Sequence, residues 1–188
     1  MKQILLTLLL TLFVSTGNAQ TEHMKFMGIP MEGTIQEFSN KLQAKGFTIA
    51  KVYPGNIAIA LNGDFAGYRD CAVGIVGDIS GRVCKINVIF PAMDKWSELE
   101  RCYNDYKSML SEKYGKPKDC VEKFQNISND DLKKSKLKID NCNYYSVFDG
   151  NNGEIELKIT PEGSYGCIVL IYSDGNPSKV RKQIINDL

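Results

Sequence analysis

The sequence is poor in the residues on which most catalytic and metal sites depend. Its 188 residues include a single histidine, His23, close to the start of the chain, where termini are usually loose. Mechanisms with a histidine base and metal sites built from histidine therefore have no support. No two cysteines form a C-x-x-C pair, which argues against thioredoxin-like chemistry and zinc knuckles. No glycine-rich phosphate-binding motif occurs either, so we expect no nucleotide, cofactor or metal.

Net charge is also small. Lys and Arg number 23 and Asp and Glu number 22, which gives a net charge of +1. Nucleic-acid-binding domains are usually strongly basic, so we expect no nucleic-acid partner. Hydrophobic residues make up 43% and charged residues 24% of the chain, as in globular rather than disordered proteins. The length suits one domain, or two small halves that share a core.

Residues 1–19 are typical of a signal peptide. Lys2 provides the positive start, Ile4 to Val14 are apolar apart from two threonines, and Gly17 and Ala19 suit a cleavage site. The apolar run is shorter than the ~20 residues that a membrane-spanning helix needs, which disfavours the alternative of an uncleaved anchor. We therefore expect an exported protein, periplasmic or extracellular. Its mature part, residues 20–188, would have no net charge and no membrane span.

The first part of the mature chain predicts one helix followed by four strands. Thr34 and Glu37 have the spacing of a capping box, and Gly46 is a suitable stop, which together predict a helix over 35–45. Turn signals at 54–55, 62–63 and 78–81 separate the strand-like runs that follow. These runs are 47–53, 57–61, 71–76 and 82–90.

The second part predicts the same order. Asp94 can cap a helix whose apolar residues between Trp96 and Tyr114 lie mostly on one face, and Gly115 ends it. Residues 149–156 (DGNNGEIE) fit a hairpin turn better than a calcium loop, because the glycine falls at the wrong position. The strand candidates are 120–125, 142–148, 154–159 and 165–172.

Two segments lie outside this order. Residues 126–140 mix acidic residues with Lys133, Lys134, Lys136 and Lys138, which favours a solvated loop or short helix; the alternative is a basic landing patch for an acidic partner. Asn176 and Pro177 can start a last helix. Its apolar stripe would be Val180, Ile184, Ile185 and Leu188.

The fold class that follows is α+β, with an antiparallel sheet covered by helices. We interpret residues 34–93 and 95–175 as a tandem structural repeat of one helix plus four strands, followed by the C-terminal helix, within a single domain over 20–188. Two such units side by side would extend one core and present a broad surface.

Six cysteines in an exported chain suggest disulfides. Cys71 and Cys84 fall four residues out of register if residue 75 faces residue 84, or ~13 Å apart, which is too far for a bond. The candidates are Cys120 with Cys142, around the charged segment, and Cys102 with Cys167, in the core. Reduced cysteines that pack as small apolar side chains are the alternative.

The loop 64–70 (DFAGYRD) contains a candidate partner-binding group. Phe65, Tyr68 and Arg69 are residue types found at protein-binding hot spots. The alternative is that both aromatic rings fold back over the edge of the core, as most large aromatic side chains do.

Two resemblances accompany these patterns. The segment Phe26-Met27-Gly28-Ile29-Pro30, followed by Gly33-Thr34, resembles the start of small exported proteins of Bacteroidota-type bacteria; that likeness brings no chemistry with it. The tandem layout resembles the beta-lactamase inhibitor protein fold. This second resemblance implies an arrangement of elements and no inhibitory residue.

The sequence therefore predicts an exported, non-enzymatic module that binds a protein or a glycan through one sheet face or its loops. One alternative is a hydrolase that uses two carboxylates, although the 22 acidic residues single out no pair. Another is a structural component of the cell envelope. A cleft with two facing carboxylates would favour the hydrolase, and an exposed apolar sheet face or aromatic loop would favour the binding module.

Overall fold

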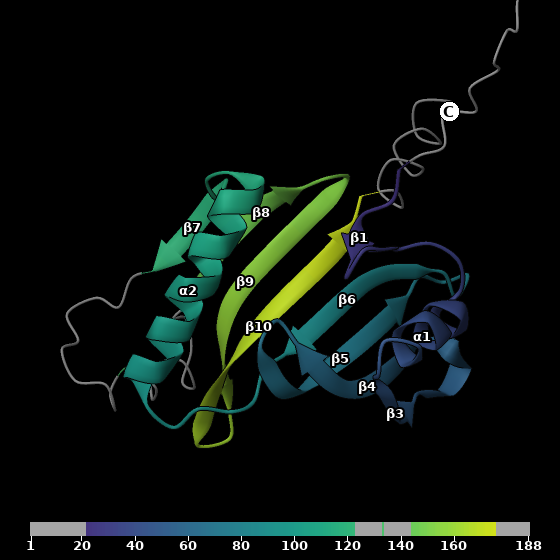
Figure 1. The fold of residues 1–188 in the computed structure, drawn as a ribbon, viewed down its shortest axis with the longest axis horizontal. Helices are drawn as coiled ribbons and strands as arrows, with labels where there is room; N and C mark the ends of the chain where they lie inside the picture. The colour runs from purple at the N-terminus through teal and green to yellow at the C-terminus, as the bar shows by residue number, and fades with distance from the viewer. Residues whose placement is uncertain (1–21, 123–132, 134–143, 176–188) are drawn as a thin grey trace, which may run out of the picture.

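The computed structural model describes residues 22–122, 133 and 144–175 (Figure 1). They form an α+β fold with one eight-stranded antiparallel sheet, a separate two-stranded hairpin and two α-helices. The predicted signal peptide, 1–19, and the predicted helix from Asn176 lie outside the described residues. Within the described ranges, no helix combines the length and the apolar character that a membrane crossing requires.

The first helix begins where the capping box predicts. In α1 (Ile35–Gln43), Thr34 Oγ1 accepts a hydrogen bond from Glu37 N at 3.2 Å, and Glu37 Oε2 accepts one from Thr34 N at 2.8 Å. Four strands follow, with the short 3-10 helix η1 (Pro54–Asn56) after the first of them. They are β3 (Thr48–Val52), β4 (Ala58–Phe65), β5 (Tyr68–Gly77) and β6 (Val83–Ile89).

The turn predicted at residues 62–63 is wrong, because Asn62 and Gly63 lie inside β4. Gly63 serves packing instead: a Cβ atom there would lie 2.5 Å from the Phe47 ring. The β4–β5 turn falls at Ala66 and Gly67, whose φ angles are 48° and 89°. These positive values suit a two-residue hairpin turn.

The second half repeats the order of elements. Helix α2 (Trp96–Tyr114) has Lys95 rather than Asp94 at its N-cap, and it ends at Gly115 with φ 85°. The predicted hairpin in 149–156 is confirmed, since Gly150 pairs with Gly153 across the turn. The strands are β7 (Asp119–Glu122), β8 (Tyr144–Gly150), β9 (Gly153–Glu162) and β10 (Tyr165–Asp174).

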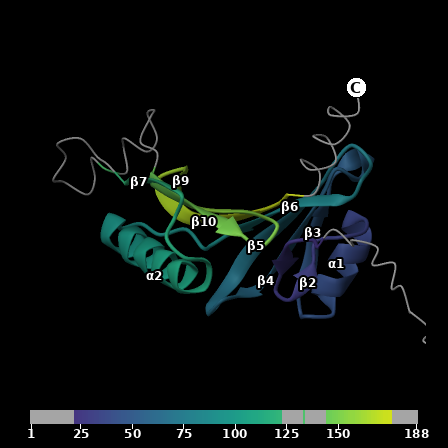
Figure 2. The same cartoon turned by 90° about the horizontal axis from the view of Figure 1, so that it is seen from above.

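One sheet joins the two halves. Its strand order is β3-β4-β5-β6-β10-β9-β8-β7, so the last strand of each half lies in the centre. Ile86 on β6 pairs with Tyr172 on β10, and Val88 pairs with Leu170; all four side chains are buried. Both helices cover the face that carries these residues, as Figure 2 shows. The opposite face is called the outer face below.

The N-terminal hairpin, β1 (Lys25–Phe26) and β2 (Ile29–Pro30), packs on the helix-bearing face between the two halves (Figure 2). The Phe26 ring is fully buried and stacks on Phe65 of β4, with ring centroids 5.4 Å apart. It also meets Tyr172 of β10 edge-on at 5.2 Å. Phe26 therefore contacts both halves of the sheet.

The proposed Cys102–Cys167 disulfide is wrong. Both cysteines are buried free thiols. Cys102 lies on α2, on the helix-bearing side, whereas the pairing of Cys167 with Thr160 and the alternation along β10 place Cys167 on the outer face. The sheet therefore separates the two sulfur atoms. Cys120 is also a free thiol, on a strand where it pairs with Ser146; its proposed partner Cys142 lies outside the described residues.

The register of the β5–β6 hairpin also differs from the prediction. Ile75 pairs with Ile86 and not with residue 84. One residue of this shift comes from the turn, where Gly77 pairs with Val83 and not with residue 82, and the other comes from a bulge between Val76 and Gly77. The bulge turns Val83 into the core and leaves Cys84 half-buried. Cys71 and Cys84 are both free, in agreement with the expectation that they do not pair.

Candidate binding cleft

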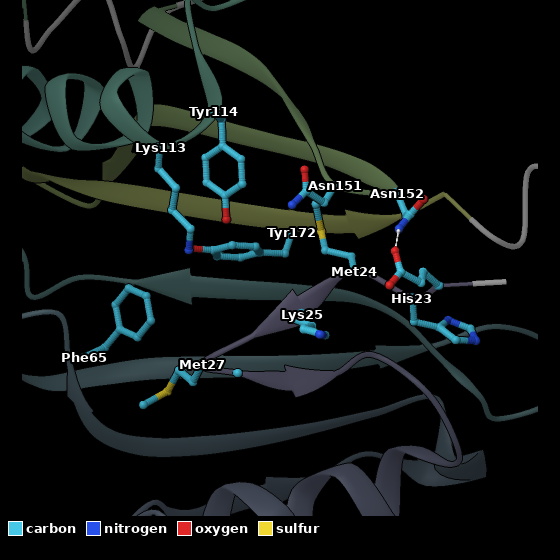
Figure 3. A pocket seen from close by; sticks show the side chains of 12 residues that line it. His23, Met24, Lys25, Met27, Phe65, Lys113, Tyr114, Asn151, Asn152 and Tyr172 are labelled. Atoms are coloured by element: carbon cyan, nitrogen blue, oxygen red, sulfur yellow. Dashed lines mark hydrogen bonds between the residues drawn. The ribbon is translucent and has the colours of Figure 1, made fainter. Parts of the chain in front are cut away.

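A cleft of about 480 Å³ opens on the helix-bearing side, where the two halves meet (Figure 3). Its volume falls within the usual range for small-molecule sites. The walls come from the N-terminal hairpin, the end of α2, the β8–β9 turn, the end of β4 and strand β10. The lining residues are Glu22, His23, Met24, Lys25, Met27, Gly28, Phe65, Lys113, Tyr114, Asn151, Asn152 and Tyr172.

One lining residue has a strained backbone conformation. Met27 and Gly28 form the two-residue turn of the N-terminal hairpin, with φ 49° and 79°. Asn or Gly normally occupies the first of these positions, since a larger side chain is strained at positive φ. Met27 nevertheless stands there with 36% of its surface exposed. Strain of this kind gathers at ligand sites more often than elsewhere.

Three aromatic side chains line the cleft. Figure 3 shows Tyr114 extending from the end of α2 toward Tyr172 on β10, with Phe65 on the other side. Burial raises the pKa of Tyr172 above its ordinary value of 10.0, so its hydroxyl stays protonated at neutral pH. Phe65 and Tyr172 are buried, so the half-buried Tyr114 offers most of the aromatic surface, and the tyrosine hydroxyls can donate and accept hydrogen bonds.

The charged and amide groups of the cleft stand around these rings. Lys113 extends from α2, with its Nζ 5.0 Å from the Tyr114 ring centre, and Lys25 comes from the hairpin below. Glu22 is the one carboxylate in the described lining, and it accepts a hydrogen bond from Asn152 Nδ2 at 3.5 Å. Asn151 adds a second, exposed amide.

His23 is held in place, which corrects the expectation of a loose terminus. Its Nδ1 lies 2.7 Å from Oδ2 of Asp174, a carboxylate whose side chain is fully buried. The other carboxylate oxygen accepts a hydrogen bond from Met24 N at 3.0 Å. Burying a carboxylate is costly without such partners, so Asp174 fixes the N-terminal segment to the end of β10. The described lining contains no serine, threonine or cysteine for this pair to activate.

Met24 completes that attachment. It is 2% exposed, and its methyl group fits between two glycines of the β8–β9 hairpin. A Cβ on Gly150 would lie 2.2 Å from Met24 Cε, and one on Gly153 would lie 3.2 Å from it. The absence of side chains at these two positions therefore provides the space that the methionine fills.

The loop residues singled out from the sequence are placed differently from one another. Phe65 is 9% exposed and packs against Phe26 and Phe90, although it also lines the cleft. Tyr68 is half-buried against Phe90. Hydrogen bonding with Cys102, together with burial, raises the pKa of Tyr68 to about 12. Arg69 is exposed. The two aromatic rings thus pack on the core, and a role of these three residues in partner binding stays a prediction.

A second polar cluster lies beneath the middle of α2. Lys107 Nζ forms an ion pair with Glu122 and lies 3.4 Å from Cys120 Sγ. The Ser146 hydroxyl lies 2.6 Å from that of Tyr103, and both residues are fully buried. These contacts attach β7 and β8 to the helix.

The outer face carries short and half-buried side chains at its centre. Ala60, Gly74, Asn87, Ile171 and Glu156 follow one another across five strands. The described elements leave this face without a helix. Of the basic segment 126–140, the structure describes Lys133, whose Nζ lies 5.5 Å from the Trp96 ring centre; its proposed role as a landing patch stays a prediction.

Comparisons with protein-family models, with curated proteins and with solved structures find no match.

Most of the cleft escaped the sequence reasoning. Lys25, Met27, Lys113, Tyr114 and Asn152 belong to three elements that only the tertiary fold brings together. Methionine before glycine in a tight hairpin was the one local signal, because that position favours asparagine or glycine.

Proposed function

We propose that the protein is an exported, non-enzymatic binding module and that the cleft takes a glycan. The observation that supports this most is the composition of the lining, in which three aromatic rings stand beside two amides and one carboxylate. Ring faces can stack on the apolar faces of sugars, and amides and carboxylates can bond neighbouring hydroxyl groups. The volume of about 480 Å³ suits a short oligosaccharide.

The hydrolase alternative has less support at this site. A glycosidase of the common type needs two carboxyl groups on either side of the bond that it cleaves, ~5–10 Å apart. In the described lining, Glu22 is the one carboxylate, and it is bound to Asn152. The buried Asp174 is occupied by His23 and the Met24 amide.

The two helix-plus-strand units give the proposal an architectural basis. We interpret residues 34–93 and 95–175 as structural repeats, since each runs one helix and four strands in the same order. The final strands of both units are neighbours, so the space between the two helices lies over the joint. The N-terminal hairpin partly fills this space, and the cleft is the part that remains open.

Titration calorimetry of the mature chain with a panel of neutral and acidic di- and trisaccharides tests the proposal. Tyr114→Ala removes one ring of the cleft and is expected to weaken binding by about tenfold, as expected for one lost stacking contact. Tyr165→Ala is the matched control, because Tyr165 is 52% exposed in the β9–β10 hairpin and absent from the lining.

Two results would contradict the assignment of the cleft as the binding site. Equal loss of binding in Tyr114→Ala and Tyr165→Ala would mean that the effect does not come from the cleft.

The binding module could instead bind a protein partner at the outer face, and Gly74→Arg tests this alternative. A Cβ at Gly74 meets only ordinary contacts, the nearest being Asn87 Cβ at 3.9 Å. Loss of binding in that variant, with Tyr114→Ala unaffected, would move the site to the outer face.

A further inference from the structure

We propose that the cleft selects sugars that carry a carboxylate, such as uronic acids, through Lys25 and Lys113. This inference rests on the proposed function, because it names the class of glycan for the same cleft. It begins from the distribution of charge. The chain as a whole is nearly neutral, with a net charge of +1, yet two ammonium groups line this one cleft.

Neither lysine of the lining is held in an ion pair with a described residue. Lys107 pairs with Glu122, Lys118 with Asp149 and Glu154, and Lys158 with Glu156. Within the described part of the chain, Lys25 and Lys113 form no ion pair of this kind. Since Glu22 is the one carboxylate of the described lining, the two ammonium groups leave the cleft with an excess of one positive charge.

The one carboxylate of the described lining lies on the side of the cleft away from Lys113. Glu22 accepts a hydrogen bond from Asn152 of the β8–β9 turn. Lys113 lies instead beside Tyr114 and Tyr172, on the side of α2 (Figure 3). The cation–π contact with Tyr114 holds the Lys113 side chain along the wall, which limits the rotamer freedom lost when it binds an anion.

A carboxylated sugar would satisfy both features of the lining. Its ring would stack on Tyr114, the half-buried aromatic ring of the lining, and its carboxylate would bind the ammonium groups, each of which offers three donors. A neutral sugar would gain the stacking but leave the excess positive charge unbalanced. Because both lysines are exposed, the charge contribution is expected to be moderate and to weaken with salt.

The experiment compares three disaccharides of equal length on the full mature chain. Digalacturonate, neutral galactobiose and a sulfated galactobiose are titrated by calorimetry at low and at raised salt. The wild type is expected to bind digalacturonate at least about tenfold more tightly than galactobiose, with the difference shrinking in salt. Lys25→Gln and Lys113→Gln are each expected to weaken digalacturonate binding by about three- to fivefold and galactobiose binding by less than about twofold.

Lys116→Gln is the matched control, since Lys116 is exposed just beyond α2 and does not line the cleft. It separates an effect inside the cleft from a general change of surface charge or of the helix end. Equal loss in Lys113→Gln and Lys116→Gln would overturn the inference. Equal affinity for galactobiose and digalacturonate would overturn it while leaving the proposed function intact. Equal affinity for the sulfated sugar would overturn selection of the carboxylate. Absence of binding to all three, and to the wider panel, would overturn the proposed function itself.

Discussion

Replacing Phe26 with alanine tests whether the N-terminal hairpin holds the two halves of the sheet together. The ring is fully buried and contacts Phe65 of the first half and Tyr172 of the second. Truncating a buried phenylalanine costs about 3–5 kcal/mol, because both the transfer free energy and the contacts around the resulting cavity are lost. For a chain of this size that corresponds to a fall in Tm of roughly 6–20 °C.

The assay is urea unfolding followed by two probes. Trp96, the single tryptophan, lies in α2 of the second half and reports on that half by fluorescence, whereas far-UV circular dichroism reports on the whole fold. If Phe26 couples the halves, both probes are expected to shift together in Phe26→Ala. Met27→Ala, at the neighbouring exposed position, serves as control and is expected to cost less than about 1 kcal/mol. A loss below about 1 kcal/mol in Phe26→Ala would refute the reasoning, as would a fluorescence transition unchanged from the wild type.

Two further predictions concern strain and charge. Met27→Asn places the preferred Asn-Gly pair in the hairpin turn. It is expected to raise the free energy of unfolding by about 0.5–1 kcal/mol and to weaken glycan binding. If urea unfolding shows the variant to be less stable than the wild type, the role assigned to strain is contradicted. At Glu122, partial burial acts to raise the pKa, but hydrogen bonds from Lys107, Cys120 and Tyr103 outweigh it and hold the pKa below its ordinary 4.5. Stability from this carboxylate is therefore present above pH 4.5 and is lost as the pH falls through the lower value of the folded state. Glu122→Gln is expected to cost about 1 kcal/mol at neutral pH and to flatten the decline in acid, and parallel stability curves for the variant and the wild type would contradict this.

Helices and strands were predicted well where a local signal, such as a capping box or a regular alternation of apolar and polar residues, marked them. The capping box at Thr34 and Glu37 sets the start of α1, and strict alternation in 154–159 marks β9. The order of helix and strands in each half followed from such signals. The prediction failed at Asn62-Gly63, where a pair typical of turns lies inside β4 because the Phe47 ring needs the space above Gly63.

Contacts between distant segments could not be predicted in this way. No local pattern predicts that Asp174 binds His23 and the Met24 amide about 150 positions earlier, because a single carboxylate at a strand end has no characteristic sequence around it. The Cys102–Cys167 proposal failed for a related reason. The patterns around both cysteines predict buried positions, but the central strand β10 has buried residues on both of its faces, so burial alone did not reveal which face Cys167 occupies.

The central place of β10 has a consequence for how the chain is made. Its neighbour β6 is complete some eighty positions before β10 is synthesised, so the growing chain carries an unpaired inner strand edge until Tyr165–Asp174 arrives. Pairing over so long a separation is slow, and open edges attract foreign strands. The β6 edge therefore needs protection from the time β6 is made until β10 follows. A chaperone could bind the edge, or the whole chain could stay unfolded until synthesis ends.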